Sequence, residues 1–210
     1  MTLSSRAERY LSALPRGRFV PVERVAEALQ RTGFPGFDTW LDFHARYAGY
    51  EEELGRETAV WGIVHDDPTW LDPGEATVER DGARLYVVCA DVHPSFDYSL
   101  YSDGEFSSTG GGGRCVSFDI KVERSAVLWE ATAEGRSWEL DFELARAAKT
   151  SREALREWAG GEIVVEASDK YATCWRSRDI IVIQRADTVT AWIATDACER
   201  ISVYLQRIPR

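Results

Sequence analysis

The first third of the chain has the apolar periodicity of amphipathic helices. Apolar residues recur every three or four positions over residues 5–14, 21–32 and 38–48, and this spacing predicts three short helices. Pro21 opens the second helix, and Asp38 is a good N-cap for the third. Glycine or proline follows each segment, so the three helices are expected to be separate elements.

From about residue 59 the pattern changes to an alternation that is typical of β-strands. Asp81-Gly82 and Ser102-Asp103-Gly104 are turn signals between two pairs of these strands. Residues 84–91 are apolar on both faces, which favours a central position in a sheet. Strands are expected at residues 59–65, 76–79, 84–91, 98–101 and 105–109.

The rest of the chain predicts a loop, further helices and a β-meander. The four glycines at 110–113 predict a flexible loop. Helices are expected at about 119–133 and, with a break near Thr150, at 137–158. Short apolar runs separated by polar pairs then predict antiparallel strands. These strands are expected at residues 162–168, 171–176, 179–184, 188–195 and 200–208.

Helices, sheet, helices and sheet thus follow one another along the chain. Because helices and strands are segregated rather than alternating, the sequence predicts an α+β fold. We expect an antiparallel central sheet flanked by helices, and a C-terminal antiparallel β-meander. Residues 1–136 are expected to form the main domain, with residues 137–210 packed on it as an accessory element.

Acidic residues are concentrated in one block of the chain. Residues 38–82 contain twelve carboxylates and three arginines, a formal charge of −9 in a chain of −10. Such a block repels nucleic acid and attracts a basic protein, although a solvated acidic surface has the same composition. The pI near 4.9 argues against direct binding of nucleic acid, which needs a basic face.

The sequence predicts no membrane or secretory segment. No apolar run reaches the roughly 18 residues of a membrane span, and the N-terminus lacks the apolar core of a signal peptide. A cytoplasmic location is therefore the default expectation. The four cysteines have no CxxC spacing and are expected to be buried free thiols. They are Cys89, Cys115, Cys174 and Cys198.

Candidate catalytic chemistry is sparse. His44 lies on the apolar face of the third predicted helix and is expected to be a buried, hydrogen-bonded core residue. Asp91, His93 and Asp97 lie within seven residues, and carboxylates with histidine suit zinc or iron. Because this cluster contains only one histidine, the alternative to a metal site is a loop whose carboxylates accept hydrogen bonds from the backbone. No metal or cofactor is therefore predicted.

Motifs for a nucleophile or for phosphate binding are missing from the sequence. It contains no G-x-S-x-G motif, and the glycine run lacks the Lys-Ser/Thr ending of a phosphate-binding loop. The eight tryptophans, by contrast, are typical of cores and of protein interfaces. We therefore expect a binding protein without catalytic residues rather than an enzyme.

Three segments in the middle of the chain, taken in order, carry a family resemblance. They are residues 37–51 (FDTWLDFHARYAGYE), residues 98–104 (YSLYSDG) and residues 115–130 (CVSFDIKVERSAVLWE). The first resembles a Phe-rich helix with its turn, the second a strand that ends in an Asp-Gly turn, and the third a closing helix. Together they resemble the SUKH superfamily over residues 20–133.

The resemblance implies a function in binding. Many bacterial members of that superfamily are immunity proteins, which bind and neutralise a cognate toxin, often a nuclease or deaminase. A toxin that handles nucleic acid needs a basic groove, and an acidic partner is steered to such a groove. The contacts are then expected to be acidic loop residues with an aromatic anchor. These are Glu51, Glu52, Glu53, Asp66, Asp67, Trp70 and Asp72.

Two other functions stay open at this point. A regulatory or scaffolding protein of the same fold needs no toxin, and a constitutive complex favours it. A metal-dependent enzyme built on the cluster at 91–97 would carry near-stoichiometric metal when purified. If the predicted contacts are right, reversing the charges at positions 66, 67 and 72 weakens partner binding and flattens its salt dependence.

Overall fold

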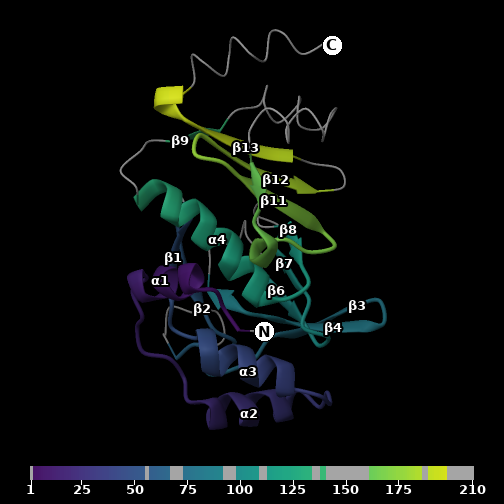
Figure 1. The fold of residues 1–210 in the computed structure, drawn as a ribbon. Helices are drawn as coiled ribbons and strands as arrows, with labels where there is room; N and C mark the ends of the chain where they lie inside the picture. Colours follow the sequence, from purple (N-terminus) through teal and green to yellow (C-terminus); the bar gives the residue numbers. More distant parts are fainter. Residues whose placement is uncertain are drawn as a thin grey trace. The chain divides into compact units, whose positions relative to one another are not determined.

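The chain forms two compact units in the computed structural model of Figure 1. The structure describes residues 2–54, 57–66, 73–91, 98–108, 113–133, 138–140, 161–185 and 189–197. Unit 1 consists of Met1–Tyr10 and Asp119–Arg210, and unit 2 of Leu11–Phe118. The predicted α+β class is confirmed, since both units combine helices with antiparallel sheets. The division falls between Phe118 and Asp119, at the start of the helix Phe118–Ala133, whereas the sequence placed it after that helix, at 136.

The three N-terminal helices are confirmed. They are α1 (Ser5–Ala13), α2 (Val22–Arg31) and α3 (Asp38–Tyr47). Asp38 is the first helical residue rather than the N-cap, because Phe37 takes that position and no side chain caps the helix. None of the helices in the described part of the chain is long and apolar enough to span a membrane.

The turn after α3 requires glycine. Gly49 has a φ of +83°, a conformation that side chains disfavour. A Cβ atom at this position would lie 2.8 Å from the carbonyl oxygen of Gly17. The same turn is held by the Gly17 N–H, which donates to the Gly49 carbonyl at 2.8 Å. The backbone that leads from α3 into the first strand can therefore approach the backbone of Gly17 closely.

Unit 2 contains two antiparallel sheets. The first has the order β1-β2-β5, with β1 at Glu51–Leu54, β2 at Glu57–Trp61 and β5 at Ala90–Asp91. The second has the order β3-β4-β6-β7-β8, with β3 at Val78–Asp81, β4 at Arg84–Val88, β6 at Tyr98–Tyr101, β7 at Phe106–Ser108 and β8 at Gly113–Cys115. The predicted hairpins are confirmed, and β4 lies inside its sheet as expected.

Three strand predictions are wrong in detail. The predicted strand at 84–91 is two strands in two sheets, because the chain crosses between the sheets at Cys89. There the Cys89 carbonyl accepts from the Gly62 N–H, and the Cys89 N–H donates to the Tyr98 carbonyl. The acidic segment of β1 is a strand rather than a loop. Strand β8 begins at the last of the four glycines, and the other three lie outside the described residues.

The core of unit 2 is a cluster of aromatic rings around Phe118. The ring centroid of Phe118 lies 4.7 Å from that of Phe43 and 5.0 Å from that of Trp61. The ring centroids of Tyr47 and Phe106 lie 5.0 and 5.1 Å from that of Phe118. All five side chains are buried. Helix α3 and the strands of both sheets therefore pack on one central residue.

Unit 1 combines helix α4 with one five-stranded antiparallel sheet. Helix α4 spans Phe118–Ala133, and its first residue belongs to unit 2. The strand order is β10-β11-β12-β13-β9. The strands are β9 at Trp138–Leu140, β10 at Glu162–Ile163, β11 at Ala172–Arg176, β12 at Ile180–Arg185 and β13 at Val189–Ala194. Two short 3₁₀ helices lie at Val165–Ala167 and Thr195–Ala197.

The predicted meander is confirmed in β10 to β13, with two corrections. The helix expected from residue 137 is wrong at its start, because Trp138–Leu140 pairs with β13 as an edge strand. The strand expected at 162–168 ends at Ile163, and a 3₁₀ helix follows it. The remainder of the helical prediction, 141–158, and the last strand, 200–208, lie outside the described residues.

Buried charged groups connect the parts of unit 1. The Arg124 side chain donates to the Asp169 carboxylate at 2.7 Å and to the Ala167 carbonyl at 2.9 Å, and both charged side chains are at most 5 % exposed. The same Asp169 oxygen accepts the N–H groups of Tyr171 and Ala172. This carboxylate therefore joins α4 to the turn that leads into β11.

Candidate partner-binding surface

The three glutamates of β1 have different environments. Glu52 is 6 % exposed, and its carboxylate accepts a hydrogen bond from the Tyr98 hydroxyl at 3.3 Å. Burial, followed by the charge of Glu52, raises the pKa of Tyr98, so the hydroxyl stays protonated as a donor. Glu51 is half-buried and Glu53 is exposed. The prediction that Glu52 is a surface contact is therefore wrong, because strand alternation turns it inward.

Asp66 is the other predicted contact that the structure describes. It is exposed and forms an ion pair of 2.9 Å with Arg24, in which both side chains are about half exposed. Such a pair adds little to stability, so the carboxylate stays available for another partner. Asp67, Trp70 and Asp72 lie outside the described residues. Of the predicted contacts, only Glu51, Glu53 and Asp66 are therefore both described by the structure and at least partly exposed.

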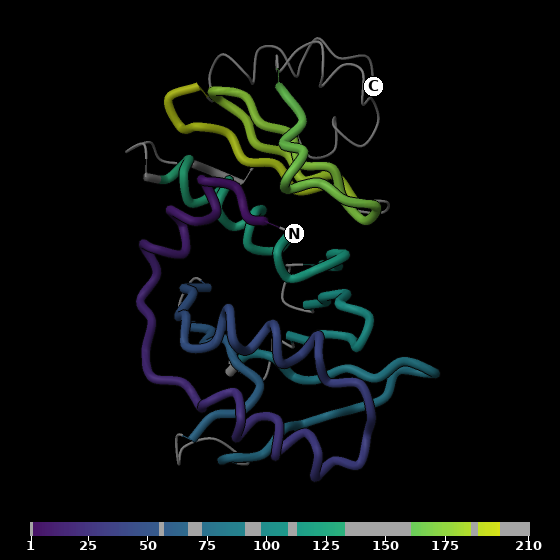
Figure 2. Tube along the Cα trace, turned by 60° about the horizontal axis from the view of Figure 1, so that its bottom comes forward, coloured from purple at the N-terminus to yellow at the C-terminus, as the bar shows by residue number. Residues whose placement is uncertain are grey.

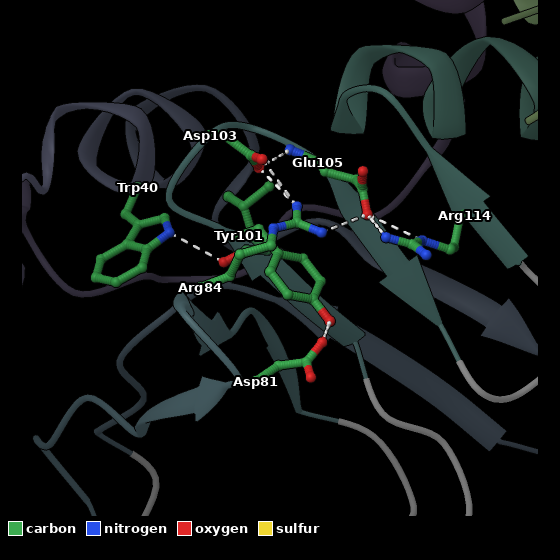
Figure 3. A network of polar contacts seen from close by, with 8 residues as sticks. Trp40, Asp81, Arg84, Tyr101, Asp103, Glu105 and Arg114 are labelled. Atoms are coloured by element: carbon green, nitrogen blue, oxygen red, sulfur yellow. Dashed lines mark hydrogen bonds and ion pairs between the residues drawn. The ribbon is translucent and has the colours of Figure 1, made fainter. Parts of the chain in front are cut away.

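A second group of acidic residues lies on one face of the sheet formed by β3, β4 and β6. Its organising residue is Arg84, whose guanidinium donates to both carboxylate oxygens of Asp103 at 2.9 Å and to Glu105 at 3.1 Å (Figure 3). Arg114 also donates to Glu105, at 2.9 Å from its Nε. Because one terminal nitrogen of Arg84 contacts Asp103 and the other contacts Glu105, the orientation of the guanidinium is fixed as well as its charge.

Two tyrosines lie beside Arg84 on the same face. The Arg84 guanidinium stacks on the Tyr101 ring, 3.9 Å from its centroid. The Tyr101 hydroxyl donates to Asp81 at 3.0 Å, and the Tyr86 hydroxyl donates to Glu79 (Figure 3 shows the first of these contacts). Burial and the hydrogen bond to Asp81 raise the pKa of Tyr101. Both hydroxyls therefore orient carboxylates of β3.

We call this group the acidic sheet face. It consists of Glu79, Asp81, Arg84, Tyr86, Tyr101, Asp103, Glu105 and Arg114. Four carboxylates against two arginines leave a net charge of −2. Sequence reasoning counted the acids of β3 in the acidic block but did not select them. The signal was present, because the Asp81-Gly82 turn fixes a register that pairs Glu79 with Tyr86 and Asp81 with Arg84.

Exposed acids outnumber exposed bases over most of unit 2. Among the described residues from 38 to 118, eight acidic side chains are exposed but only two arginines, Arg80 and Arg114. The exposed acids are Asp38, Asp42, Glu53, Asp66, Glu75, Glu79, Asp81 and Asp103. A surface of this charge raises the association rate of a basic protein.

His44 is a core residue, as predicted. It is fully buried, its Nδ1 accepts the Ile63 N–H at 3.1 Å, and its Nε2 lies 2.8 Å from the Val20 carbonyl. The proton is therefore on Nε2, because only a donor satisfies that carbonyl. Burial lowers the pKa of His44. Both ring nitrogens are used by the fold, which leaves His44 no catalytic role.

Most of the predicted histidine–carboxylate cluster lies outside the part of the chain that the structure describes. Only the backbone of Asp91 is described there, and His93 and Asp97 lie outside the described residues. Within the part of the chain that the structure covers, no three His, Cys, Asp or Glu side chains converge as ligands for a metal ion. Three of the predicted thiols, Cys89, Cys115 and Cys174, are buried and form no disulfide with one another, and Cys198 lies outside the described residues.

Burial raises the pKa of the Cys174 thiol to about 11, so this cysteine is not a reactive thiolate at neutral pH. The described residues thus include an acidic surface that carries two tyrosines. Comparison with known proteins adds no assignment, because no family model, curated protein or solved structure matches the chain.

Proposed function

We propose that this protein is a non-enzymatic immunity-type protein, which neutralises a cognate bacterial toxin by covering a basic, nucleic-acid-handling active site with an acidic surface. The observation that carries the proposal is the excess of eight exposed acids over two exposed arginines in the described residues 38–118. A basic groove and such a surface are complementary in charge, which accelerates association and favours this partner over acidic ones.

The acidic sheet face supplies the second argument. Its carboxylates are held by Arg84 and by the hydroxyls of Tyr86 and Tyr101, so a partner meets groups that are already oriented. Preorganised groups lose less conformational freedom on binding than free surface side chains do. Tyr101 is only 8 % exposed, so the half-buried Tyr86 is the tyrosine of this face that a partner can contact as an anchor. We therefore place the partner on the acidic sheet face rather than on Glu52.

The toxin in this proposal comes from the resemblance of residues 20–133 to the SUKH superfamily. Charge and geometry support a basic protein partner without specifying its activity. The absence of an enzymatic role is likewise a proposal. It is supported by the way Arg84, Glu105 and His44 are engaged by neighbouring groups of the fold.

The test joins capture to a toxicity assay. Tagged protein is mixed with lysate of its native host at low salt, and bound proteins are eluted in salt steps and identified. Each is then expressed in a bacterial host alone and together with this chain. We expect one basic protein that elutes early in the salt gradient, stops growth when expressed alone and permits growth when co-expressed.

Two double variants make the test specific. Glu79→Lys/Asp81→Lys reverses two charges on the acidic sheet face, and Glu23→Lys/Glu27→Lys makes the same change at exposed positions of α2. The first should weaken capture at least tenfold and abolish rescue, while the second should leave rescue intact. Captured proteins that are all harmless when expressed alone would refute the immunity function. Equal losses in both variants would refute the assignment to this face.

A further inference from the structure

The acidic sheet face ends at an open sheet edge. Strand β3 is the first strand of the order β3-β4-β6-β7-β8, and among the described residues only β4 pairs with it. The β3–β4 hairpin projects beyond the other strands of its sheet in both views (Figures 1 and 2). Gly82, with a φ of +59°, takes the first position of its two-residue turn, as type II′ turns require. An open edge is a template for another strand.

The register shows which backbone groups face this edge. Thr77 is bonded to β4, because its carbonyl accepts the Val88 N–H at 3.1 Å. In an antiparallel ladder the bonded residues alternate, so Glu79 and Asp81 also bond to β4. Val78 and Arg80 therefore direct their N–H and C=O groups outward. An added strand could bond to all four of these groups.

The two faces of the edge differ in chemistry. Glu79 and Asp81 lie on the acidic sheet face, where they are exposed beside Tyr86 and Tyr101. Val78 and Arg80 lie on the opposite face, and the Arg80 guanidinium lies 5.9 Å from the centroid of the Phe34 ring. A strand that fits this edge therefore has basic residues on one face and apolar residues on the other.

A second copy of the chain does not fit the edge. When two β3 strands pair antiparallel in one continuous sheet, residues of one face meet residues of the same face. In the register that pairs Arg80 with Arg80, Glu79 would face Asp81 of the other copy, and in the register that pairs Arg80 with Val78, Glu79 would face Glu79. Directly opposed like charges destabilise a strand pair. The charges that protect this edge from self-association thus leave it open to a basic strand.

We propose that the outer edge of β3 binds an extended segment of the partner in which Lys or Arg alternates with apolar residues. The segment adds a strand to the sheet through Val78 and Arg80, and its basic side chains meet Glu79 and Asp81. This inference rests on the proposed function and specifies its contact. It explains why ordered carboxylates and an unpaired strand edge occur in the same hairpin.

The probe is a synthetic seven-residue peptide in which lysine and valine alternate, with a glutamate–valine peptide as its control. Binding to the full chain is followed by ¹H–¹⁵N NMR and amide hydrogen exchange. We expect the lysine peptide to slow exchange of the Val78 and Arg80 amides. The Glu79 amide, already bonded to β4, should change little. The glutamate peptide should not bind.

Arg80→Pro removes an outward N–H and should not break the bonds to β4, because proline is tolerated at strand edges. It should weaken peptide binding at least tenfold, whereas Arg80→Ala, which keeps the N–H, should preserve most of it. Glu79→Gln/Asp81→Asn keeps both acceptors and should cost about three- to tenfold in affinity. Because this pair reports the charge contribution alone, protection of the Val78 and Arg80 amides in the unmutated chain tests the edge even if Arg80→Pro does not fold.

Binding without protection of Val78 and Arg80, or equal binding by the proline and alanine variants, would overturn strand addition in favour of surface charge alone. Absence of binding by the lysine peptide would overturn it as well. The proposed function is judged separately. If Arg80→Pro still rescues growth while Glu79→Lys/Asp81→Lys does not, neutralisation stands and the strand-edge mode fails.

Discussion

The two units of this protein use charge in opposite ways. Unit 2 carries eighteen carboxylates and nine arginines, a net charge of −9, while unit 1 carries seventeen carboxylates and sixteen basic residues, a net charge of −1. Unit 1 buries charged side chains inside its fold, among them Glu123, Arg124 and Asp169. Unit 2 has an aromatic core and keeps most of its described acids at the surface.

This difference indicates what each unit's charges are for. In unit 1, the fully buried Glu123 accepts the backbone N–H and the hydroxyl of Ser4 at 2.6 and 2.7 Å, which ties the N-terminus to α4. Such charges hold the chain together and cannot reach a partner. The exposed acids of unit 2 contribute little to its stability, so they are available for recognition.

The largest expected effect is in the aromatic core of unit 2. Phe118→Ala removes the ring that contacts Phe43, Tyr47, Trp61 and Phe106. Because a cavity remains, we expect a loss of about 3–5 kcal/mol in the free energy of unfolding of unit 2. Denaturant unfolding with amide hydrogen exchange measures it for each unit. Phe118→Leu should cost clearly less, and equal costs would show that ring packing does not dominate this core.

The matching experiment in unit 1 removes a charge rather than a ring. Arg124→Met leaves the Asp169 carboxylate, 3 % exposed, without its cation. We expect a loss of about 3 kcal/mol in the unfolding free energy of unit 1. Adding Asp169→Asn should recover part of the loss, because the uncompensated charge disappears. A double-mutant cycle measures this coupling, and strictly additive losses would contradict the buried pair as the cause.

Phe118 and Arg124 also show how much of the structure can be predicted from the sequence. Phe118 directly precedes the helix predicted at about 119–133, and the sequence did not identify it as the centre of a core. The bond from Arg124 to Asp169 crosses 45 positions, and no local pattern contains that information. The same limit explains Glu52: three consecutive glutamates resemble a solvated loop, and only pairing with β2 reveals a strand with one inward side chain.

Local patterns were sufficient where turn chemistry fixes the register. Asp81-Gly82 and Ser102-Asp103-Gly104 gave both hairpins of the second sheet correctly. Short edge strands such as β9 and β8 were missed, because three residues carry too little periodicity and their partners are distant in sequence. The acidic sheet face could have been predicted from the first hairpin, but its link to Asp103 and Glu105 through Arg84 needed the three-dimensional structure.

The next prediction concerns the carboxylate that joins three arginines of unit 1. Glu130 accepts hydrogen bonds from Arg6 at 3.0 Å, from Arg9 at 2.7 Å and from Arg176. Partial burial opposes ionisation, but hydrogen bonds from Arg176 and Arg9 and the nearby positive charge lower the pKa of Glu130. Glu130→Gln should cost unit 1 about 1–2 kcal/mol at neutral pH.

The pH dependence of this loss follows from the sign of the shift. A carboxylate whose pKa is lower in the folded state stabilises the fold above its unfolded pKa of about 4.5, and this contribution is lost as the pH falls through the folded value. The difference between wild type and Glu130→Gln should therefore be constant near neutrality and shrink below about pH 4.5. Urea titrations at several pH values measure it. A constant difference down to pH 2 would contradict the charge-based explanation.

The smallest effect is expected from His44, and it separates the two units by pH. Burial lowers the pKa of His44 below 6.5, so between the folded pKa and about 6.5 the unfolded chain binds the extra proton. Unit 2 should therefore lose stability as the pH falls below about 6.5, by at most about 1.4 kcal/mol per pH unit.

Protonation of His44 at Nδ1 would also place two donors against each other, because Nδ1 now accepts the Ile63 N–H at 3.1 Å. His44→Gln should flatten this slope, and His65→Gln, which removes a smaller electrostatic contribution to the lowered pKa of His44, should reduce the slope less. Hydrogen exchange at pH 7 and pH 5 should show faster opening of unit 2 alone, because the Glu130 contribution to unit 1 is still complete at pH 5. Equal acceleration in both units would refute the separation of charge roles between them.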